Sequence, residues 1–155
     1  MYGEGPNDAD VMMIGQNPGK EEIKQKRPFV GRSGRYLDKV LQQNGIDRSK
    51  LYLTGVVKEA TPGNRKPNAR EIARWMPCLI AEIKRIKPKL IVLMGRVAWE
   101  TPRFEGIEYI ETYHPAAAMR FPEIRKRFEA DISKLKKIQK YKKNERSFRK
   151  TPHRS

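Results

Sequence analysis

Apolar and polar positions alternate in two ways along the chain. Short apolar runs of the length expected of buried strands are separated by longer segments in which apolar residues recur at helical spacing. The runs predict strands at 11–14, 51–57, 90–94 and 107–112. The longer segments predict helices at 34–44, 68–87, 95–99 and 122–137. Strands that alternate with helices indicate an α/β fold with three layers, α/β/α, in which helices cover both faces of a four-stranded parallel sheet.

The longest predicted helix has defined ends and one apolar face. Asn68 followed by Glu71 is the pattern of a capping box at a helix start, and Pro88 ends the segment. The apolar residues form a single stripe, which is typical of a helix packed against a core rather than of a cofactor pocket. They are Ile72, Trp75, Met76, Leu79, Ile80, Ile83 and Ile86.

Length and charge narrow the class of protein. The chain has 155 residues, enough for one domain with its own core, and we expect residues 1–137 to form it. The formal net charge is +16; the segment Lys134–Ser155 holds ten Lys or Arg against Glu145, which leaves +7 for residues 1–133. We expect residues 138–155 to be a basic, flexible tail. A body that is basic without this tail favours a polyanionic partner, most simply nucleic acid, over a merely solvated surface.

Few residues are available for disulfides or metals. Cys78 is the only cysteine, which excludes an internal disulfide and a cysteine-built metal site. The only histidines are His114 and His153, so the sequence shows no set of zinc ligands. No apolar stretch approaches the roughly 20 residues that span a bilayer, and no signal peptide is present. We therefore expect a cytoplasmic, nucleoid-associated monomer with no metal and no membrane partner.

The polar residues with the most chemistry follow the predicted strands. Gln16 and Asn17 follow the first strand, the basic loop 58–65 follows the second, and His114 follows the fourth. Gly95-Arg96 follows the third strand. We interpret it as a turn that serves packing, and a contact with phosphate is the alternative. Ligands of parallel sheets bind beyond the carboxyl ends of the strands, so these residues should gather at one edge.

Such a pocket suits a flipped-out nucleobase. An enzyme that acts on a base takes it out of the duplex and stacks it, as the ring of Phe29 would do. His114 would donate a hydrogen bond to a carbonyl oxygen on which negative charge grows. Asn17 would hold a water near the sugar carbon. Because an amide is not a strong base, the chemistry would depend on stabilising an anionic leaving group and a cationic sugar.

Five short motifs occur in a recognisable order. They are GEGP at 3–6, GQNPG at 15–19, RPFVGRSG at 27–34, PGNR at 62–65 and YHPAA at 113–117. In this order the chain resembles the uracil-DNA glycosylase superfamily, and most closely family 4, the thermostable bacterial and archaeal type. The resemblance covers Gly3 to Lys137. It implies a monofunctional DNA glycosylase of base excision repair, which hydrolyses the N-glycosidic bond of uracil in DNA and leaves an abasic site.

The resemblance also assigns roles to residues. Asn17 and His114 match the catalytic positions, and Gln16, Phe29 and Gly55 match positions that bind the base. The asparagine at 17 is similar to that of the mismatch-specific uracil/thymine glycosylases. The remaining matches imply contacts to DNA. The turn of Gly63, Asn64 and Arg65 resembles a loop that contacts phosphate. Ala116, Met119 and Arg120 belong to the segment that matches the loop entering the duplex.

The chain departs from family 4 at the iron–sulfur cluster. That family holds the cluster with four cysteines, and its amino-terminal pair has no counterpart here. The positions of the later pair hold Glu59 and Trp75, while Cys78 lies three residues past the second. We therefore predict no cluster and no other cofactor, with Trp75 and its apolar neighbours packing in its place.

The chain also departs at the second strand, where Gly55 replaces an asparagine that reads the edge of uracil. Losing that side chain predicts looser or altered base choice. Glycosylase action on hypoxanthine, xanthine or mismatched thymine is one alternative, and DNA binding without cleavage is another. A lyase that forms a Schiff base is disfavoured, because no lysine is evidently buried in the pocket.

Overall fold

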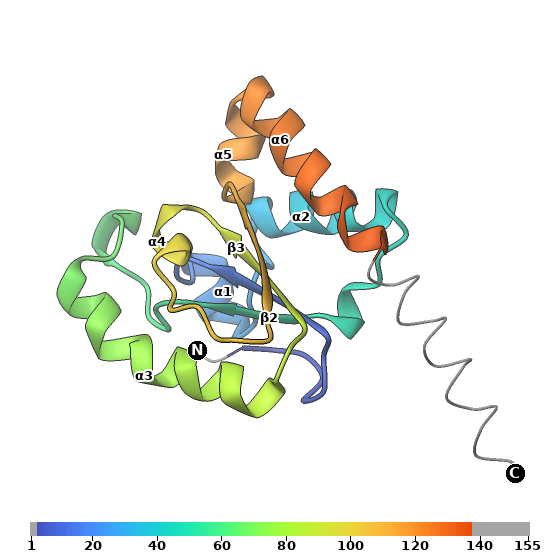
Figure 1. Cartoon of the computed structure of the whole chain (residues 1–155). Coiled ribbons are helices and arrows are strands. Elements are labelled where there is room, and N and C mark those ends of the chain that lie inside the picture. Colours follow the sequence, from blue (N-terminus) through green and yellow to red (C-terminus); the bar gives the residue numbers. More distant parts are fainter. Residues whose placement is uncertain (1–2, 138–155) are drawn as a thin grey trace, which may run out of the picture.

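The computed structural model describes residues 3–137 and has three layers (Figure 1). The central sheet has the order β2-β1-β3-β4, and every neighbouring pair is parallel. The predicted four-stranded parallel sheet is therefore confirmed. Residues 138–155, predicted to be a flexible tail, lie outside the described residues. The strands are β1 (Val11–Gly15), β2 (Tyr52–Gly55), β3 (Leu90–Met94) and β4 (Glu108–Thr112).

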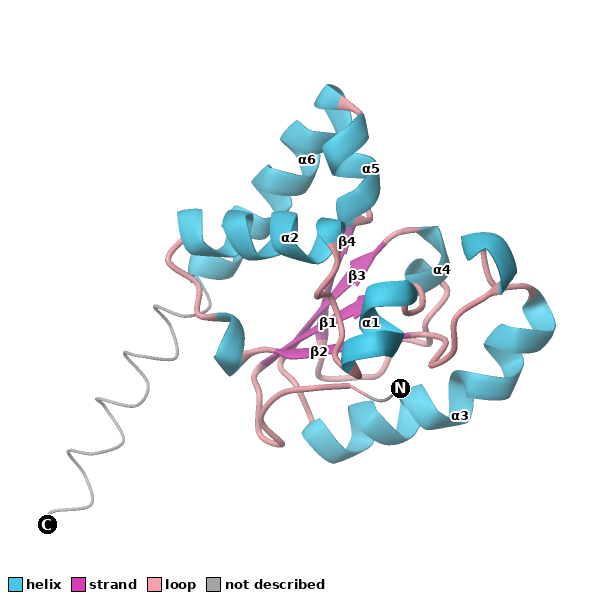
Figure 2. Cartoon of the chain, turned by 180° about the vertical axis from the view of Figure 1, so that it is seen from behind, coloured by secondary structure: helices cyan, strands magenta, loops and turns pink. Residues whose placement is uncertain are grey.

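Helices cover both faces of this sheet. Figure 2 shows α3 along one face and α2, α5 and α6 grouped on the other. The helices are α1 (Lys20–Gln25), α2 (Arg32–Gln43), α3 (Ala69–Ile86), α4 (Arg96–Trp99), α5 (Pro115–Arg120) and α6 (Pro122–Ser133). Two 3₁₀ turns, Arg48–Lys50 and Pro62–Asn64, come before and after β2 in the sequence. Within residues 3–137, none of the helices combines the length and apolarity that a membrane crossing requires.

Alternation along the strands builds two separate apolar layers. Met13 of β1 packs with α2, α5 and α6, whereas its neighbours Met12 and Ile14 pack with α3 and α4. All three side chains are fully buried. Successive strand residues face opposite sides, so a continuous apolar run is what a sheet covered on both faces requires.

Two short helices differ from the expected structure. Lys20–Gln25, with a single apolar residue, forms α1, and Glu22 accepts the hydrogen of the Gly19 amide at the start of this helix. Residues 116–120, expected to be a loop, belong to α5, which has Pro115 at its first position and His114 as its N-cap. Proline at the first helical position lacks only an N–H that would have no intrahelical partner.

Candidate active site

A pocket of about 320 Å³ lies at the carboxyl edge of the sheet. It is lined by residues that follow β1, β2 and β4, together with the segment between α1 and α2. Seven predicted site residues line it: Gln16, Asn17, Phe29, Gly55, Asn64, His114 and Ala116. The predicted convergence of these residues at one sheet edge is therefore what the structure shows.

The other predicted DNA contacts lie outside the pocket lining. Gly63 is exposed in the turn after β2, and Arg65 pairs with Glu71 through two contacts of 2.7 and 3.2 Å. Met119 lines a second cavity with Tyr36 and Arg125, between α2, α5 and α6.

Arg120 is exposed at the corner between α5 and α6, and its guanidinium carbon lies 5.3 Å from the ring centroid of Phe121. At the end of β3, Gly95 packs close to His114, since a Cβ there would meet the His114 Cβ at 3.4 Å. Arg96 is exposed at the start of α4. The position of Gly95 supports the packing interpretation of this turn.

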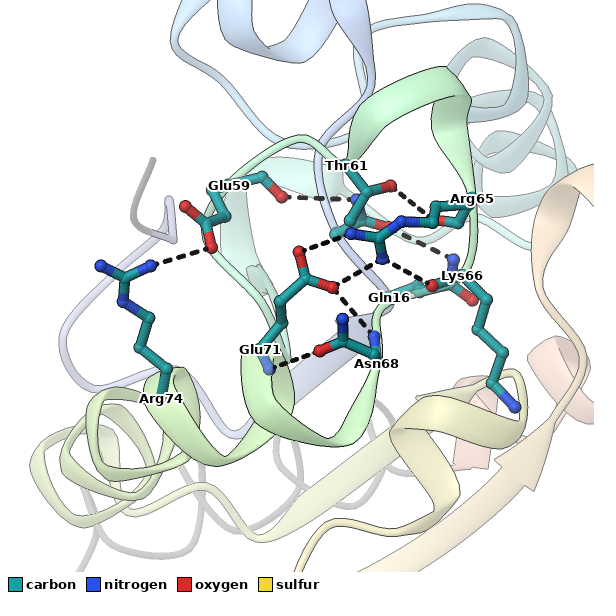
Figure 3. Close-up of polar contacts among 9 residues, drawn as sticks. Gln16, Glu59, Thr61, Arg65, Lys66, Asn68, Glu71 and Arg74 are labelled. Carbon is teal, nitrogen blue, oxygen red and sulfur yellow. Dashed lines mark hydrogen bonds and ion pairs between the residues drawn. The ribbon is translucent and has the colours of Figure 1, made fainter.

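The carboxamide of Asn17 is held by the loop after β2. Its Nδ2 donates to the Glu59 carbonyl oxygen at 3.3 Å and to Thr61 Oγ1 at 3.5 Å. Its Oδ1 accepts a hydrogen bond from Gln16 Nε2 at 3.2 Å. Figure 3 shows Gln16, Glu59 and Thr61 gathered beside the capping box of α3. The amide nitrogen of Asn17 therefore faces the loop, and the oxygen keeps a lone pair for a further donor.

Phe29 has an unusual backbone conformation that its neighbours hold in place. Its φ of 52° lies in the left-handed region that residues with a Cβ rarely adopt. Arg48 donates to the carbonyl oxygens of Phe29 and Pro28, at 2.7 and 2.5 Å, and also pairs with Asp38 at 2.7 Å. Backbone strain of this kind persists where surrounding contacts over-determine it, often at functional sites.

Two glycines allow the close approach of Phe29. A Cβ on Gly15, at the end of β1, would lie 2.6 Å from Phe29 Cζ. A Cβ on Gly34, in the first turn of α2, would lie 2.0 Å from the Phe29 carbonyl oxygen. The ring therefore lies against the end of the central strand, and its backbone lies against the start of α2.

Glu22 is a pocket residue that sequence reasoning missed. Its carboxylate accepts hydrogen bonds from the backbone amides of Gly19, Val30 and Gly31, at 3.0, 2.9 and 2.6 Å. It thus ties the turn after β1 to the segment that carries Phe29. A glutamate three residues after Gly19 was the available signal, because a glutamate at N3 can accept from the N-cap amide, which is the half of a capping box that a glycine N-cap allows.

His114 is held as a neutral hydrogen-bond donor. Its Nδ1 accepts from the Ala116 backbone amide at 3.0 Å, so the ring proton lies on Nε2. Burial lowers the pKa of His114 below its ordinary value, although the negative charge of Glu22 acts in the opposite direction. Both the hydrogen bond and the lowered pKa favour the neutral ring.

Gly55 forms one wall of the pocket, and Asn64 also lines the pocket. A Cβ on Gly55 would lie 3.3 Å from the Val57 carbonyl oxygen and 3.4 Å from that of Gln16, so this edge is narrow. Asn64, with φ 57°, is the last residue of the Pro62–Asn64 turn. Within residues 3–137, its carboxamide makes no hydrogen bond, which leaves it available to a ligand.

A buried lysine lies directly behind that wall, which the sequence did not lead us to expect. The Lys58 side chain is 1% exposed and forms an ion pair with Glu82. Its Nζ also donates to Gly55 O at 2.5 Å and Thr54 Oγ1 at 2.8 Å. Burial lowers the pKa of Lys58, and the carboxylate of Glu82 opposes that change. An ammonium engaged in these contacts is a structural group and not a free amine nucleophile.

The residues at the matching iron–sulfur positions do not fit a cluster. Such clusters are held by cysteine thiolates. Glu59 pairs with Arg74 at 3.6 Å, and Trp75 packs against the apolar layer under α3. Cys78 is a free thiol, and residues 3–137 contain no group of three or more potential metal ligands.

Known proteins resemble the chain over most of its length. The family described as the Uracil DNA glycosylase superfamily matches residues 2–136. A type-4 uracil-DNA glycosylase of Sulfurisphaera tokodaii is 34% identical, with 88% of this chain and 73% of that protein covered. Enzymes with the same name from Pyrobaculum aerophilum and Archaeoglobus fulgidus are 35% and 30% identical. The matches cover 84% and 86% of this chain, and 79% and 78% of those proteins.

Proposed function

Because the chain belongs to the uracil-DNA glycosylase superfamily, we propose that it is a monofunctional glycosylase that releases uracil from DNA. The reaction hydrolyses the N-glycosidic bond and leaves an abasic site, the first step of base excision repair. The observation that carries the proposal is the meeting of Asn17, Phe29 and His114 in one pocket at the sheet edge. We further propose that the protein acts as a monomer on cytoplasmic, nucleoid DNA.

The pocket residues support a stepwise account of base release. The flipped base stacks on the ring of Phe29, which Gly15 and Arg48 hold in position. As the bond between base and sugar breaks, its electron pair passes to the base. The Nε2–H of His114 then donates to the carbonyl oxygen where this charge collects. A preformed donor at such a position lowers the barrier because it needs no reorganisation during the reaction.

Water completes the reaction at the sugar carbon. Asn17 Oδ1 has one lone pair engaged by Gln16 and accepts a hydrogen bond from the attacking water with the other. The water oxygen bonds to the sugar carbon, its second proton passes to solvent, and the departing base takes a proton from solvent. Asn17 therefore orients the nucleophile rather than deprotonating it.

The proposed enzyme works without a metal or iron–sulfur cofactor. Glu59 and Trp75 replace the thiolates that a cluster would need, and both have other contacts. Iron analysis and the visible absorption spectrum of the purified protein test this directly. Stoichiometric iron with a charge-transfer band would overturn it.

Gly55 leaves the base specificity open to test, because it replaces an asparagine that reads the edge of uracil in the family that the chain resembles. Release of uracil, hypoxanthine, xanthine and thymine opposite guanine is measured from matched labelled oligonucleotides, single- and double-stranded, with alkali to reveal abasic sites. We expect uracil to be released. Release of purine lesions would favour a second candidate, a glycosylase whose base choice Gly55 has widened. Tight, salt-sensitive binding without release of any base would instead indicate a DNA-binding protein.

The roles of His114 and Asn17 are tested by substitution. His114→Ala and Asn17→Ala should each lower the single-turnover rate of uracil release by about a hundredfold or more. The Kd for uracil-containing DNA should change little, because neither side chain is a phosphate contact. Asn7→Ala, an exposed asparagine before β1, is the matched control. Equal losses in rate and binding would contradict these roles.

A further inference from the structure

We infer that Thr61 is a positioning residue that fixes which side of the Asn17 carboxamide faces the pocket. The inference rests on the proposed function, because it concerns the residue proposed to orient water. Thr61 lies on the loop after β2, immediately before the Pro62–Asn64 turn, and is 5% exposed. It does not line the pocket itself.

The hydroxyl of Thr61 can act toward Asn17 only as an acceptor. Its single hydrogen is donated to the Arg65 carbonyl oxygen. The Oγ1 atom therefore receives the hydrogen bond from Asn17 Nδ2 at 3.5 Å. The second partner of that nitrogen, the Glu59 carbonyl oxygen at 3.3 Å, has no hydrogen to donate.

Two acceptors on one side leave the carboxamide a single stable orientation. Turning Asn17 by 180° would place its oxygen against Thr61 Oγ1 and the Glu59 carbonyl. The Glu59 carbonyl would lose its donor, and Thr61 could donate to Asn17 only by giving up its hydrogen bond to the Arg65 carbonyl oxygen. In the observed orientation Gln16 Nε2 donates to Asn17 Oδ1, which agrees with the same assignment. The oxygen needed by the attacking water is thus kept on the pocket side.

The same hydroxyl links Asn17 to the turn proposed to face DNA. Thr61 closes the turn through Arg65 O, and Arg65 is fixed in turn by Glu71 of the α3 capping box (Figure 3). Thr61 therefore contacts both the amide proposed to hold water and the turn proposed to contact DNA phosphates. Removing the hydroxyl should loosen the amide, and it also removes the contact with the Arg65 carbonyl oxygen. The guanidinium of Arg65 should stay in place because it keeps both contacts with Glu71.

The test compares Thr61→Val with two matched variants. Valine keeps the shape but cannot accept a hydrogen bond, whereas Thr61→Ser keeps the hydroxyl. Thr101→Val removes a buried hydroxyl that makes no hydrogen bond in the described structure and lies away from the pocket. Single-turnover uracil release should fall about tenfold in Thr61→Val, with the Kd for DNA unchanged. Thr61→Ser and Thr101→Val should match the wild type.

A double variant separates positioning from a merely structural role. Thr61→Val should cause no further loss of rate in an Asn17→Ala background, because Thr61 acts through Asn17. Additive losses, or a Thr61→Val rate equal to that of Thr101→Val, would overturn the inference. Melting temperatures are measured for every variant, and Thr61→Ala carries the same test if the valine variant does not fold. Failure of the wild type to release any base would instead overturn the proposed function.

Discussion

Phe29 shows how much of the site depends on single contacts. Its ring lies against Gly15, its backbone lies against Gly34, and its φ of 52° is maintained by Arg48. None of these neighbours carries out chemistry in the proposed reaction. They fix the position and tilt of the surface on which a base would stack, and a displaced ring would weaken stacking directly.

Gly15→Ala should displace this ring. The added Cβ would lie 2.6 Å from Phe29 Cζ, so the ring must move away from the end of β1. We expect base binding to weaken, seen as a KM for uracil-containing DNA raised by about tenfold. Phe29→Leu provides the reference, because the loss from Gly15→Ala should largely disappear when the ring is already absent. Undiminished loss in the double variant would show that Gly15 acts through another contact.

The protonation of His114 predicts how activity depends on pH. Burial lowers its pKa, and protonation at Nδ1 would break the bond from the Ala116 amide. The single-turnover rate should therefore stay level as the pH falls to about 6.5, the ordinary histidine value, and decline only below it. A rate that halves near pH 6.5 would contradict a lowered pKa.

The same group predicts a change of stability with pH. Below about pH 6.5 the unfolded chain binds a proton that folded His114 does not, so the free energy of unfolding falls as the pH is lowered. The fall ends once the pH is below the folded pKa. Urea unfolding of wild type and His114→Ala between about pH 5 and 8 isolates this contribution, since His153 is common to both proteins.

At the scale of elements, a buried polar cluster joins β2 to α3. Glu82 of α3 accepts hydrogen bonds from Tyr52 Oη at 2.6 Å, from Thr54 Oγ1 at 3.0 Å and from the Gly3 amide at 3.2 Å. It also pairs with Lys58. A single carboxylate thus ties the N-terminal segment, the sheet edge and the longest helix together beneath the pocket wall.

Breaking this cluster at Glu82 should destabilise the fold strongly. Glu82→Leu leaves the Lys58 ammonium without its carboxylate and removes the acceptor of three further donors, so we expect a loss of about 3–5 kcal/mol in urea unfolding. Lys58→Met should cost less, because Glu82 keeps those donors. Glu105→Gln, an exposed carboxylate, is the control and should change little. The reverse order of the two losses would contradict the central role of Glu82.

Periodicity predicted the large elements because they bury enough apolar surface to show it. The sheet, α2, α3 and α6 follow from apolar runs and stripes, and the α3 capping box is present as predicted. The segment of α1 gave no such signal: its one apolar residue, Ile23, is 43% exposed, and Glu22 stabilises it through contacts with residues 30 and 31. Local pattern does not contain contacts of that kind.

The candidate site was predictable to a similar extent and for similar reasons. Gln16, Asn17 and His114, which follow strands directly, line one pocket as predicted, because parallel topology brings strand ends together. Gly95 and Arg96, which follow β3, do not line it. Lys58 was missed because charged residues are almost never buried unless paired, and its partner lies 24 positions away on α3. Thr61 was missed because the role inferred for it depends on which atom its hydroxyl donates to, and that contact is not visible in a sequence.

At the scale of the whole molecule, positive charge should govern binding to DNA. Residues 138–155 contain seven Lys or Arg and one acid, so a chain ending at Lys137 keeps a net charge of +10 from the total of +16. Binding through phosphates releases counterions, and log Kobs then falls linearly with log salt concentration, with a slope of about −0.9 per neutralised phosphate on duplex DNA. The slope therefore counts phosphate contacts.

Removing residues 138–155 should separate DNA binding from chemistry. If the tail binds phosphates, the truncated protein will show a shallower salt slope and a weaker Kd at low salt. Its single-turnover rate with saturating enzyme should equal that of the full chain, because every residue proposed for the reaction lies between Gln16 and Ala116. Arg120→Gln tests the folded domain in the same way. Losing one phosphate contact should make the salt slope shallower by about 0.9. An unchanged slope after truncation would show that the tail binds no phosphate and that the charge of the folded domain alone accounts for the affinity.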